Sequence, residues 1–200
     1  MRKKLAEMTS NLLNPFLVGL AIIVLITLDS ASSVTDALKW IVISLGLTFV
    51  PVLGVMLYLV YSDRIEGISI RMRQQRDKIY LLSCACGVIS CIVLFSMGAP
   101  LVLIASFVAG LCAIVIFMCI NLWWKISVHT ALVGGSVTML IVLYGFTGAI
   151  SAVLLPAVTW SRIELKHHSL AQVGAGALLS AAIVAVVFLL FGLVGRVSPV

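Results

Sequence analysis

Long apolar runs dominate the chain, and three polar segments interrupt them. The runs over residues 12–28, 40–61, 79–97 and 100–122 each approach the roughly 20 residues that an α-helix needs to cross a bilayer. The strong alternation of apolar and polar positions that is typical of a membrane β-barrel is absent from the sequence. The pattern therefore predicts four transmembrane helices in this part of the chain, the second of them kinked at Pro51.

The C-terminal part of the chain continues the apolar pattern. Residues 130–160 form an apolar stretch of 31 residues, which is too long for one helical span and short for two full ones. Gly145 and Gly148 divide it into two short helices that meet at a turn. A last helix is predicted over 170–193. The chain is thus expected to be an all-α integral membrane protein with six to seven transmembrane helices.

We call residues 62–78, 123–129 and 160–176 the first, second and third polar segments. Counted from the N-terminus, they follow two, four and six predicted crossings, so all three should face the same side of the membrane. The first is basic and suits an amphipathic helix lying along the interface. We expect one membrane domain over residues 1–200, made of two N-terminal helices in 1–61, the basic segment at 62–78 and a helical core in 79–200.

Composition and charge support membrane insertion and indicate its direction. The chain is 62% hydrophobic and 10% charged, against roughly 45–50% and about 25% in soluble proteins. The net charge of +6 comes from Lys and Arg beside the apolar runs, which favours membrane topology and anionic ligands over nucleic acid. Eleven of the thirteen Lys and Arg lie on the side of the polar segments. The positive-inside rule therefore predicts a multi-pass inner or plasma membrane protein whose polar segments face the cytoplasm.

The polar segments combine residue types suited to phosphate chemistry. Arg and Lys bind phosphate oxygens, and His129 and His168 come from different segments, where each can act as nucleophile or proton donor. Carboxylates are scarce, which argues against a magnesium site, and the five cysteines lie within apolar runs without zinc-like spacing. The residues predict phosphoryl transfer through a phosphohistidine, with no metal and no cofactor.

Two motifs and a basic stretch carry a family resemblance. In the third segment, Ser-Arg162-x5-His168-x3-Gln172 resembles the third signature of the type 2 phosphatidic acid phosphatase superfamily, Ser-Arg-x5-His-x3-Asp. In the second, Lys125-Ile-Ser-Val-His129 resembles the usual Pro-Ser-Gly-His, and residues 71–78 look like a degenerate first signature, Lys-x6-Arg-Pro. This superfamily comprises membrane lipid phosphatases and is related to vanadium haloperoxidases. The resemblance covers roughly residues 64–194 and implies that the last five helices form a lipid-phosphatase-like core.

The resemblance implies a role for each matching residue. His168 would attack phosphorus, Arg162 would bind the phosphate oxygens and the developing charge, and His129 would protonate the leaving oxygen. Backbone N–H groups around Ser127 and Val128 would add donors. The first segment fits in two registers, Arg71 with Lys78 or Arg73 with Arg76, and the sequence leaves both open. The implied phosphate-binding set is Arg71, Arg73, Arg76, Lys78, Lys125 and Ser127.

The chain departs from the family pattern at the orienting residue. Gln172 stands where the signature has Asp, so it can fix the tautomer of His168 but cannot stabilise an imidazolium by charge. Loss of such a carboxylate lowers kcat about 10⁴-fold in the serine protease example. Val128 in place of Gly also narrows the conformational freedom of its loop. These departures fit a slower enzyme, a subfamily that uses Gln, or a phosphate binder.

The expected function is a membrane lipid phosphatase acting on a lipid phosphomonoester or a prenyl diphosphate, such as a polyprenyl diphosphate or phosphatidylglycerol phosphate. The substrate and the bilayer are its expected partners, while the lipid and the oligomeric state stay open. A non-catalytic lipid-phosphate binder or transporter is the alternative, and a structural membrane subunit is the third interpretation. His167 is a rival nucleophile, and Arg162 and Lys166 are also interpretable as topology anchors. The glycine pairs 134–135 and 174/176 predict close helix packing.

Overall fold

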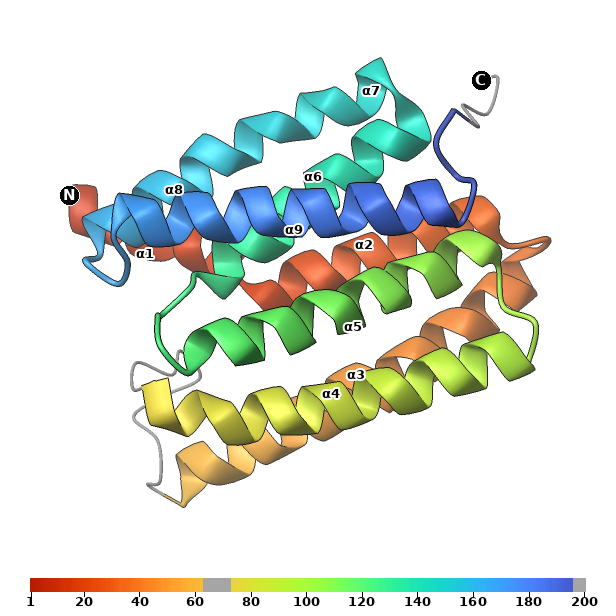
Figure 1. Cartoon of the computed structure of the whole chain (residues 1–200), viewed down its shortest axis with the longest axis horizontal. Coiled ribbons are helices and arrows are strands. Elements are labelled where there is room, and N and C mark those ends of the chain that lie inside the picture. Colours follow the sequence, from red (N-terminus) through yellow and green to blue (C-terminus); the bar gives the residue numbers. More distant parts are fainter. Residues whose placement is uncertain (63–72, 196–200) are drawn as a thin grey trace. The chain divides into compact units, whose positions relative to one another are not determined.

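The computed structural model describes residues 1–62 and 73–195, with side chains at 1–62 and 77–195 (Figure 1). All regular elements in these ranges are helices. They are α1 (Arg2–Leu12), α2 (Pro15–Ser30), α3 (Val34–Tyr61), α4 (Arg73–Ser96), α5 (Leu101–Asn121), α6 (Val128–Tyr144), α7 (Phe146–Ala149), the 3₁₀ helix η1 (Ile150–Val153), α8 (Leu154–Glu164) and α9 (Leu170–Leu190). The prediction of an all-α chain is confirmed.

Length and composition make most of these helices candidate membrane spans. Among the described residues, five helical stretches are long and apolar enough to cross a bilayer: α3, the part of α4 from Asp77, α5, Phe146–Glu164 and α9. The bent pair α1 and α2 makes a sixth if it counts as one span, and α6 is a shorter apolar helix of 17 residues. The chain is therefore an all-α integral membrane protein.

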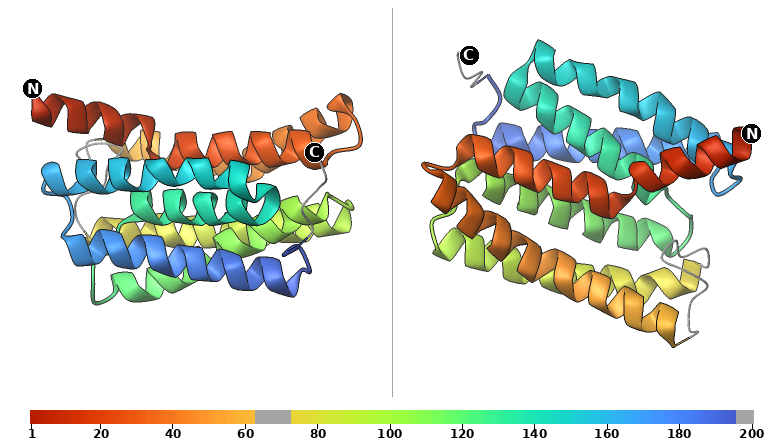
Figure 2. Two further views of the ribbon diagram at one scale, coloured as in Figure 1. Left: turned by 90° about the horizontal axis from the view of Figure 1, so that it is seen from above. Right: turned by 180° about the vertical axis from the view of Figure 1, so that it is seen from behind.

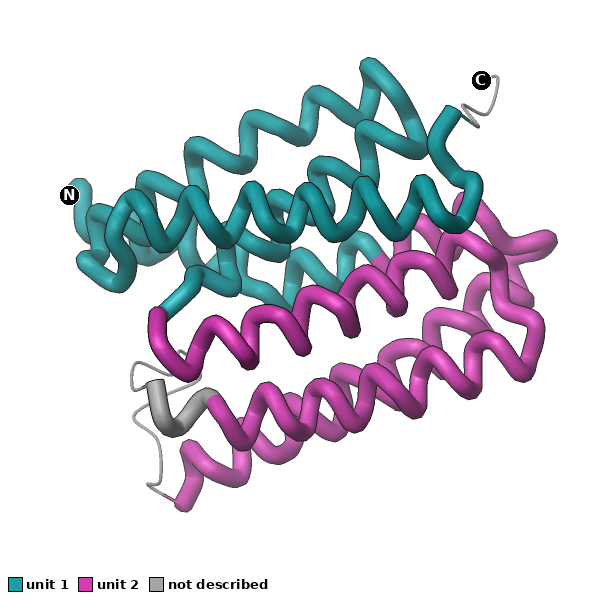
Figure 3. Tube along the Cα trace, viewed as in Figure 1, with its two compact units in different colours: residues 1–22, 125–200 teal, residues 23–124 magenta. Residues whose placement is uncertain are grey.

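The chain divides into two compact units (Figure 3). The first contains Met1–Ile22 and Lys125–Val200, and the second contains Ile23–Trp124. The second and third polar segments, from Lys125 on, therefore belong to the first unit together with α1. The sequence pattern gave no sign that the N-terminal helix groups with the last four α-helices.

The N-terminus begins with a helix that the apolar pattern did not predict. α1 ends at Leu12, and α2 begins at Pro15 after a 41° bend. Proline suits the first position of a helix because its missing N–H needs no partner there. The Asn14 side chain caps α2, since its Oδ1 accepts from the Leu17 N–H at 2.9 Å. The predicted span 12–28 is thus α2, and a separate polar helix precedes it.

The second unit is built on helical hairpins. Ser33 caps α3 by accepting from the Asp36 N–H at 3.1 Å, and α3 continues through Pro51 to Tyr61. α4 and α5 pack side by side and are joined by a tight turn in which Gly98 has φ 70°. At the other end of this pair, Asn121 Nδ2 donates to Asp77 Oδ1 at 2.8 Å. The apolar runs at 79–97 and 100–122 therefore form a tight helical hairpin.

In the first unit, α6 and α9 run parallel and in close contact (Figures 1 and 2). A Cβ on Gly134 would lie 2.8 Å from the Ala177 carbonyl oxygen, and one on Gly176 would lie 2.6 Å from that of Ser127. Ser180 Oγ adds a hydrogen bond to the Ala131 carbonyl at 2.6 Å. Close packing is confirmed at these two glycines. It is wrong for Gly174, where an added Cβ would meet no atom of the described residues within 4 Å.

The turn predicted at Gly145 to Gly148 is also confirmed. Gly145 ends α6 with φ 58°, a conformation that L side chains rarely adopt. Gly148 then packs directly on the carbonyl of Leu140, where a side chain has no room. The chain returns along α6 through α7, η1 and α8, and Val133, Val137 and Val158 form a buried cluster between the two arms. Because α8 runs back along α6, the third polar segment lies near the N-terminal end of α6.

Candidate functional site

The end of α8 explains the spacing between Arg162 and His168. Lys166 adopts φ 55°, and its N–H donates to the Ile163 carbonyl at 2.9 Å. The His167 N–H donates to the Arg162 carbonyl at 3.1 Å, and the His168 N–H points to the same oxygen at 3.4 Å. The first two bonds are those of a Schellman helix end. The residues between Arg162 and His168 form this turn. His168 therefore follows immediately after the last helical turn of α8, which carries Arg162.

The start of α9 holds the His168 ring. Ser169 and Gln172 form a capping box, in which Ser169 Oγ accepts from the Gln172 N–H at 3.3 Å and Gln172 Oε1 accepts from the Ser169 N–H at 3.2 Å. The same Oε1 lies 3.1 Å from His168 Nδ1. One amide oxygen therefore caps the helix and contacts the histidine.

The capping box determines which nitrogen of His168 carries the proton. The Ser169 N–H is a donor, so the Gln172 atom facing it is the oxygen rather than the NH₂ group. That oxygen can only accept, so His168 Nδ1 must donate to it. In the neutral ring, Nε2 then keeps its lone pair. Gln172 thus contacts the ring of His168 through an amide oxygen, where the family signature has a carboxylate.

Arg162 is buried and bonded to the N-terminal helix. Its side chain is in the last turn of α8 and is only 5% exposed. Its Nη1 donates to Ser10 Oγ of α1 at 2.7 Å, and Ser10 is also 5% exposed. A weaker surface ion pair between Arg2 and Glu164, at 3.5 Å, joins the same two helices. Burial of a guanidinium is costly without partners, so this arrangement is typical of a functional position.

The start of α6 lies against the start of α9. The Ser127 N–H donates to the Gln172 carbonyl at 3.4 Å, and Ser127 Oγ accepts from the Thr130 N–H at 3.5 Å as the N-cap. Ser127 is fully buried, and His129 is partly exposed in the first turn of α6. The N-terminal ends of two parallel helices are therefore adjacent. Each end carries a partial positive charge, which favours a bound anion.

The structure brings together predicted site residues of the second and third polar segments. It does not test those of the first segment. Ser127, Gln172 and His168 are linked by hydrogen bonds, Arg162 contacts the His168 N–H through its own carbonyl, and Lys125 and His129 belong to the same unit. Lys78 is exposed on α4 in the other unit. Arg71 lies outside the described residues, as do the side chains of Arg73 and Arg76, so the contribution of the first segment stays a prediction.

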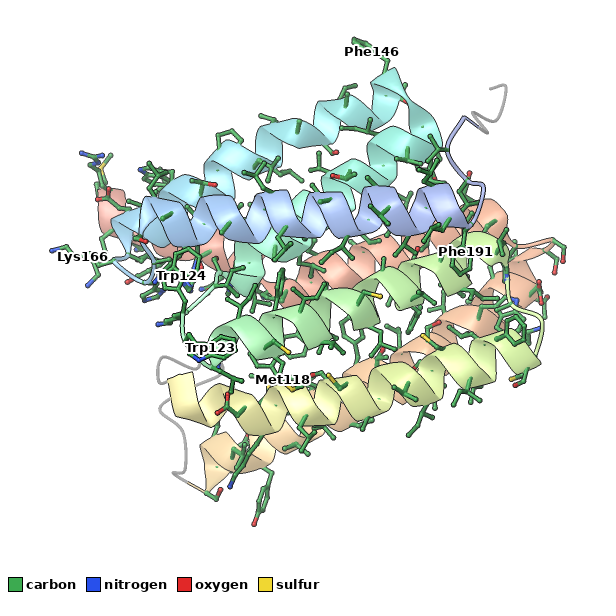
Figure 4. The ribbon with its side chains drawn as sticks, in the orientation of Figure 1. Met118, Trp123, Trp124, Phe146, Lys166 and Phe191 are labelled. Atoms are coloured by element: carbon green, nitrogen blue, oxygen red, sulfur yellow. The ribbon has the colours of Figure 1, made fainter. Side chains whose placement is uncertain are left out.

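The two remaining polar candidates are His167 and Lys166. His167 is partly exposed and joins the turn through its backbone N–H, whereas His168 is only 8% exposed. Lys166 is exposed and projects outward from the turn (Figure 4). His168 is thus the more buried of the two histidines, and the Gln172 side chain contacts its Nδ1.

Sequence reasoning missed Ser10. Ala6 and Ser10 are buried and four residues apart on α1, while Leu5, Met8 and Leu12 are exposed. Small residues at this spacing mark the face of a helix that approaches another closely. That signal was present in the sequence, but it gave no indication that the partner helix was α8.

Among the described residues, no group of three His, Cys, Asp or Glu side chains is placed to hold a metal ion. No protein-family model, curated protein or solved structure matches this chain. The assignment of a function therefore depends on the site itself.

Proposed function

We propose that this chain is a membrane lipid phosphatase that hydrolyses a lipid phosphomonoester or a prenyl diphosphate through a phosphohistidine at His168. The observation that carries the proposal is the contact of 3.1 Å between His168 Nδ1 and Gln172 Oε1, since it leaves Nε2 as the nucleophilic nitrogen. The buried Arg162 is the second support. Both residues belong to the motif that resembles the type 2 phosphatidic acid phosphatase superfamily.

The proposed reaction has two displacements at phosphorus. His168 Nε2 attacks the phosphorus atom, an N–P bond forms, and the bond to the leaving oxygen breaks while His129 gives that oxygen a proton. His129 then takes a proton from water, the water oxygen attacks the phosphohistidine, and the N–P bond breaks to release phosphate. Arg162 binds the phosphate oxygens, and the adjacent helix ends favour their negative charge.

The surroundings of the site suit a lipid substrate. The motif residues lie at the ends of apolar helices, so a phosphate bound there can keep its hydrocarbon tail in the bilayer. The excess of Lys and Arg on this side supports a site at the cytoplasmic face of an inner or plasma membrane. Biosynthetic intermediates such as polyprenyl diphosphates or phosphatidylglycerol phosphate are therefore the first substrates to test.

Phosphate release from the purified protein in detergent tests the proposal. The panel consists of prenyl diphosphates, phosphatidic acid and phosphatidylglycerol phosphate, each with EDTA present. We expect release that survives EDTA, disappears in His168→Ala and persists in His167→Ala. The neighbouring histidine is a matched control because its backbone contact with Arg162 is kept in the alanine variant. Release that persists in His168→Ala would overturn the assignment of the nucleophile.

A non-catalytic lipid-phosphate binder or transporter is the second candidate. The neutral Gln172 favours it, because an amide gives the imidazolium formed during attack less support than a carboxylate does. This function predicts saturable binding of the same lipids without any release of phosphate. Binding that is lost in Arg162→Ala, together with no turnover on the whole panel, would establish it in place of the phosphatase.

A further inference from the structure

We propose that Ser10 of α1 is a further phosphate-binding residue of this site, acting beside Arg162. The inference deepens the proposed function and rests on it for the nature of the ligand. It assigns a role to a helix outside the region that resembles the phosphatase superfamily, which begins near residue 64.

Ser10 lies beside the guanidinium of Arg162. Ser10 Oγ lies 2.7 Å from Arg162 Nη1, and both side chains are 95% or more removed from solvent. A guanidinium has five N–H donors, so a phosphate oxygen bound by Arg162 lies within a short distance of any group bonded to it. Ser10 is thus placed next to the position that the phosphate would occupy.

The hydroxyl of Ser10 forms a different hydrogen bond from that of Thr9, its neighbour on α1. Serine and threonine in helices usually donate to a carbonyl one turn earlier, as Thr9 does to the Leu5 carbonyl at 3.0 Å. Ser10 instead accepts from Arg162, and within residues 1–62 and 77–195 its own O–H has no hydrogen-bond acceptor. A buried hydroxyl gains from an acceptor, and a phosphate oxygen bound at Arg162 supplies one.

The α1 side chain that contacts Arg162 is a neutral hydroxyl. A carboxylate at position 10 would neutralise the guanidinium and compete with phosphate for its donors. A serine oxygen accepts the same hydrogen bond without cancelling the positive charge. Ser10 can therefore hold Arg162 in place before the substrate arrives and then donate to the substrate, which a carboxylate or an alanine cannot do.

Binding of inorganic phosphate and of orthovanadate to the full chain in detergent tests this role. Ser10→Ala is expected to weaken both by about 10- to 100-fold, because hydrogen bonds to charged groups are among the stronger ones. Ser10→Thr, which restores a hydroxyl, should recover most of the affinity. Thr9→Ala is the matched control, since the Thr9 hydroxyl donates to the Leu5 carbonyl within α1, and this variant should bind phosphate as the parent chain does.

The outcomes separate this inference from the proposed function. If Ser10→Ala binds phosphate as tightly as the parent chain, Ser10 does not bind phosphate and serves only as a contact between α1 and α8. A second outcome is that the parent chain binds phosphate, Ser10→Ala does not, and neither hydrolyses any lipid. Ser10 would then be a phosphate-binding residue of a non-catalytic protein, and only the proposed phosphatase activity would be refuted. Absence of phosphate binding in the parent chain would overturn both. Should Ser10→Ala fail to fold, Ser10→Cys retains the shape with a weak S–H donor and should bind less tightly than the parent.

Discussion

The contact between α6 and α9 gives a sharp prediction, because α9 carries one glycine in the contact and one outside it. In Gly176→Ala, the new Cβ would lie 2.6 Å from the Ser127 carbonyl oxygen and 2.9 Å from Thr130 Oγ1. Ordinary contact begins near 3.4 Å, so the helices must separate by about 0.8 Å at this point. Gly174→Ala is the matched control, since within residues 1–62 and 73–195 its Cβ would meet nothing closer than 4 Å.

The expected magnitudes follow from two opposing effects. Alanine is about 0.8–1 kcal/mol better than glycine inside a helix, and both variants gain this. Overpacking costs about 1–3 kcal/mol and applies to Gly176→Ala alone. Gly174→Ala should therefore be more stable than the parent chain, and Gly176→Ala should fall below Gly174→Ala by about 1–3 kcal/mol. For a chain of this size, that is a difference in Tm of about 2–12 °C.

Thermal unfolding in detergent, followed by tryptophan fluorescence, measures this difference. Activity provides a second readout, because the clash pushes on Ser127 and the start of α6, while Gly174→Ala leaves both in place. Equal Tm values for the two alanine variants would refute the close approach of α6 and α9, and with it the adjacency of their N-terminal ends at the site.

Changes at three positions test other parts of the site and its support. Gln172→Glu keeps the side-chain length and the capping box and adds a negative charge beside the imidazolium, so kcat should rise about tenfold. Unchanged kcat in this variant would show that the amide already suffices. Gln172→Leu should lose both activity and stability, because it removes the capping box. Lys166→Gly removes the Cβ from a residue with φ 55° and should raise stability by about 0.5–1 kcal/mol at unchanged KM, and a lower Tm would contradict the left-handed turn. Gly148→Ala places a Cβ against the Leu140 carbonyl and should destabilise by about 2 kcal/mol or more in chemical denaturation, while a neutral effect would argue against that turn.

The local parts of the candidate site were predictable. The Arg162-x5-His168 spacing is a property of one helix end, and the Ser169 to Gln172 capping box lies within four consecutive residues, so the residues that form these features are close in sequence. The tautomer of His168 could not be predicted from the sequence. It follows from the Ser169 N–H, which fixes the direction of the Gln172 amide only once the helix has formed.

The pattern of apolar runs by itself determined the apolar helices and the membrane class of this protein, because a chain in hydrocarbon must satisfy its backbone hydrogen bonds within each segment. It did not determine the polar helix α1, which precedes the first apolar run. The neighbours of those helices were decided only by the tertiary structure. Ser10 and Arg162 are 152 residues apart, and their contact depends on small residues that let two helices approach. Small residues recur throughout membrane helices, so their presence marks a packing face without naming its partner. For this reason α1 joins the candidate site only when the folded chain is seen.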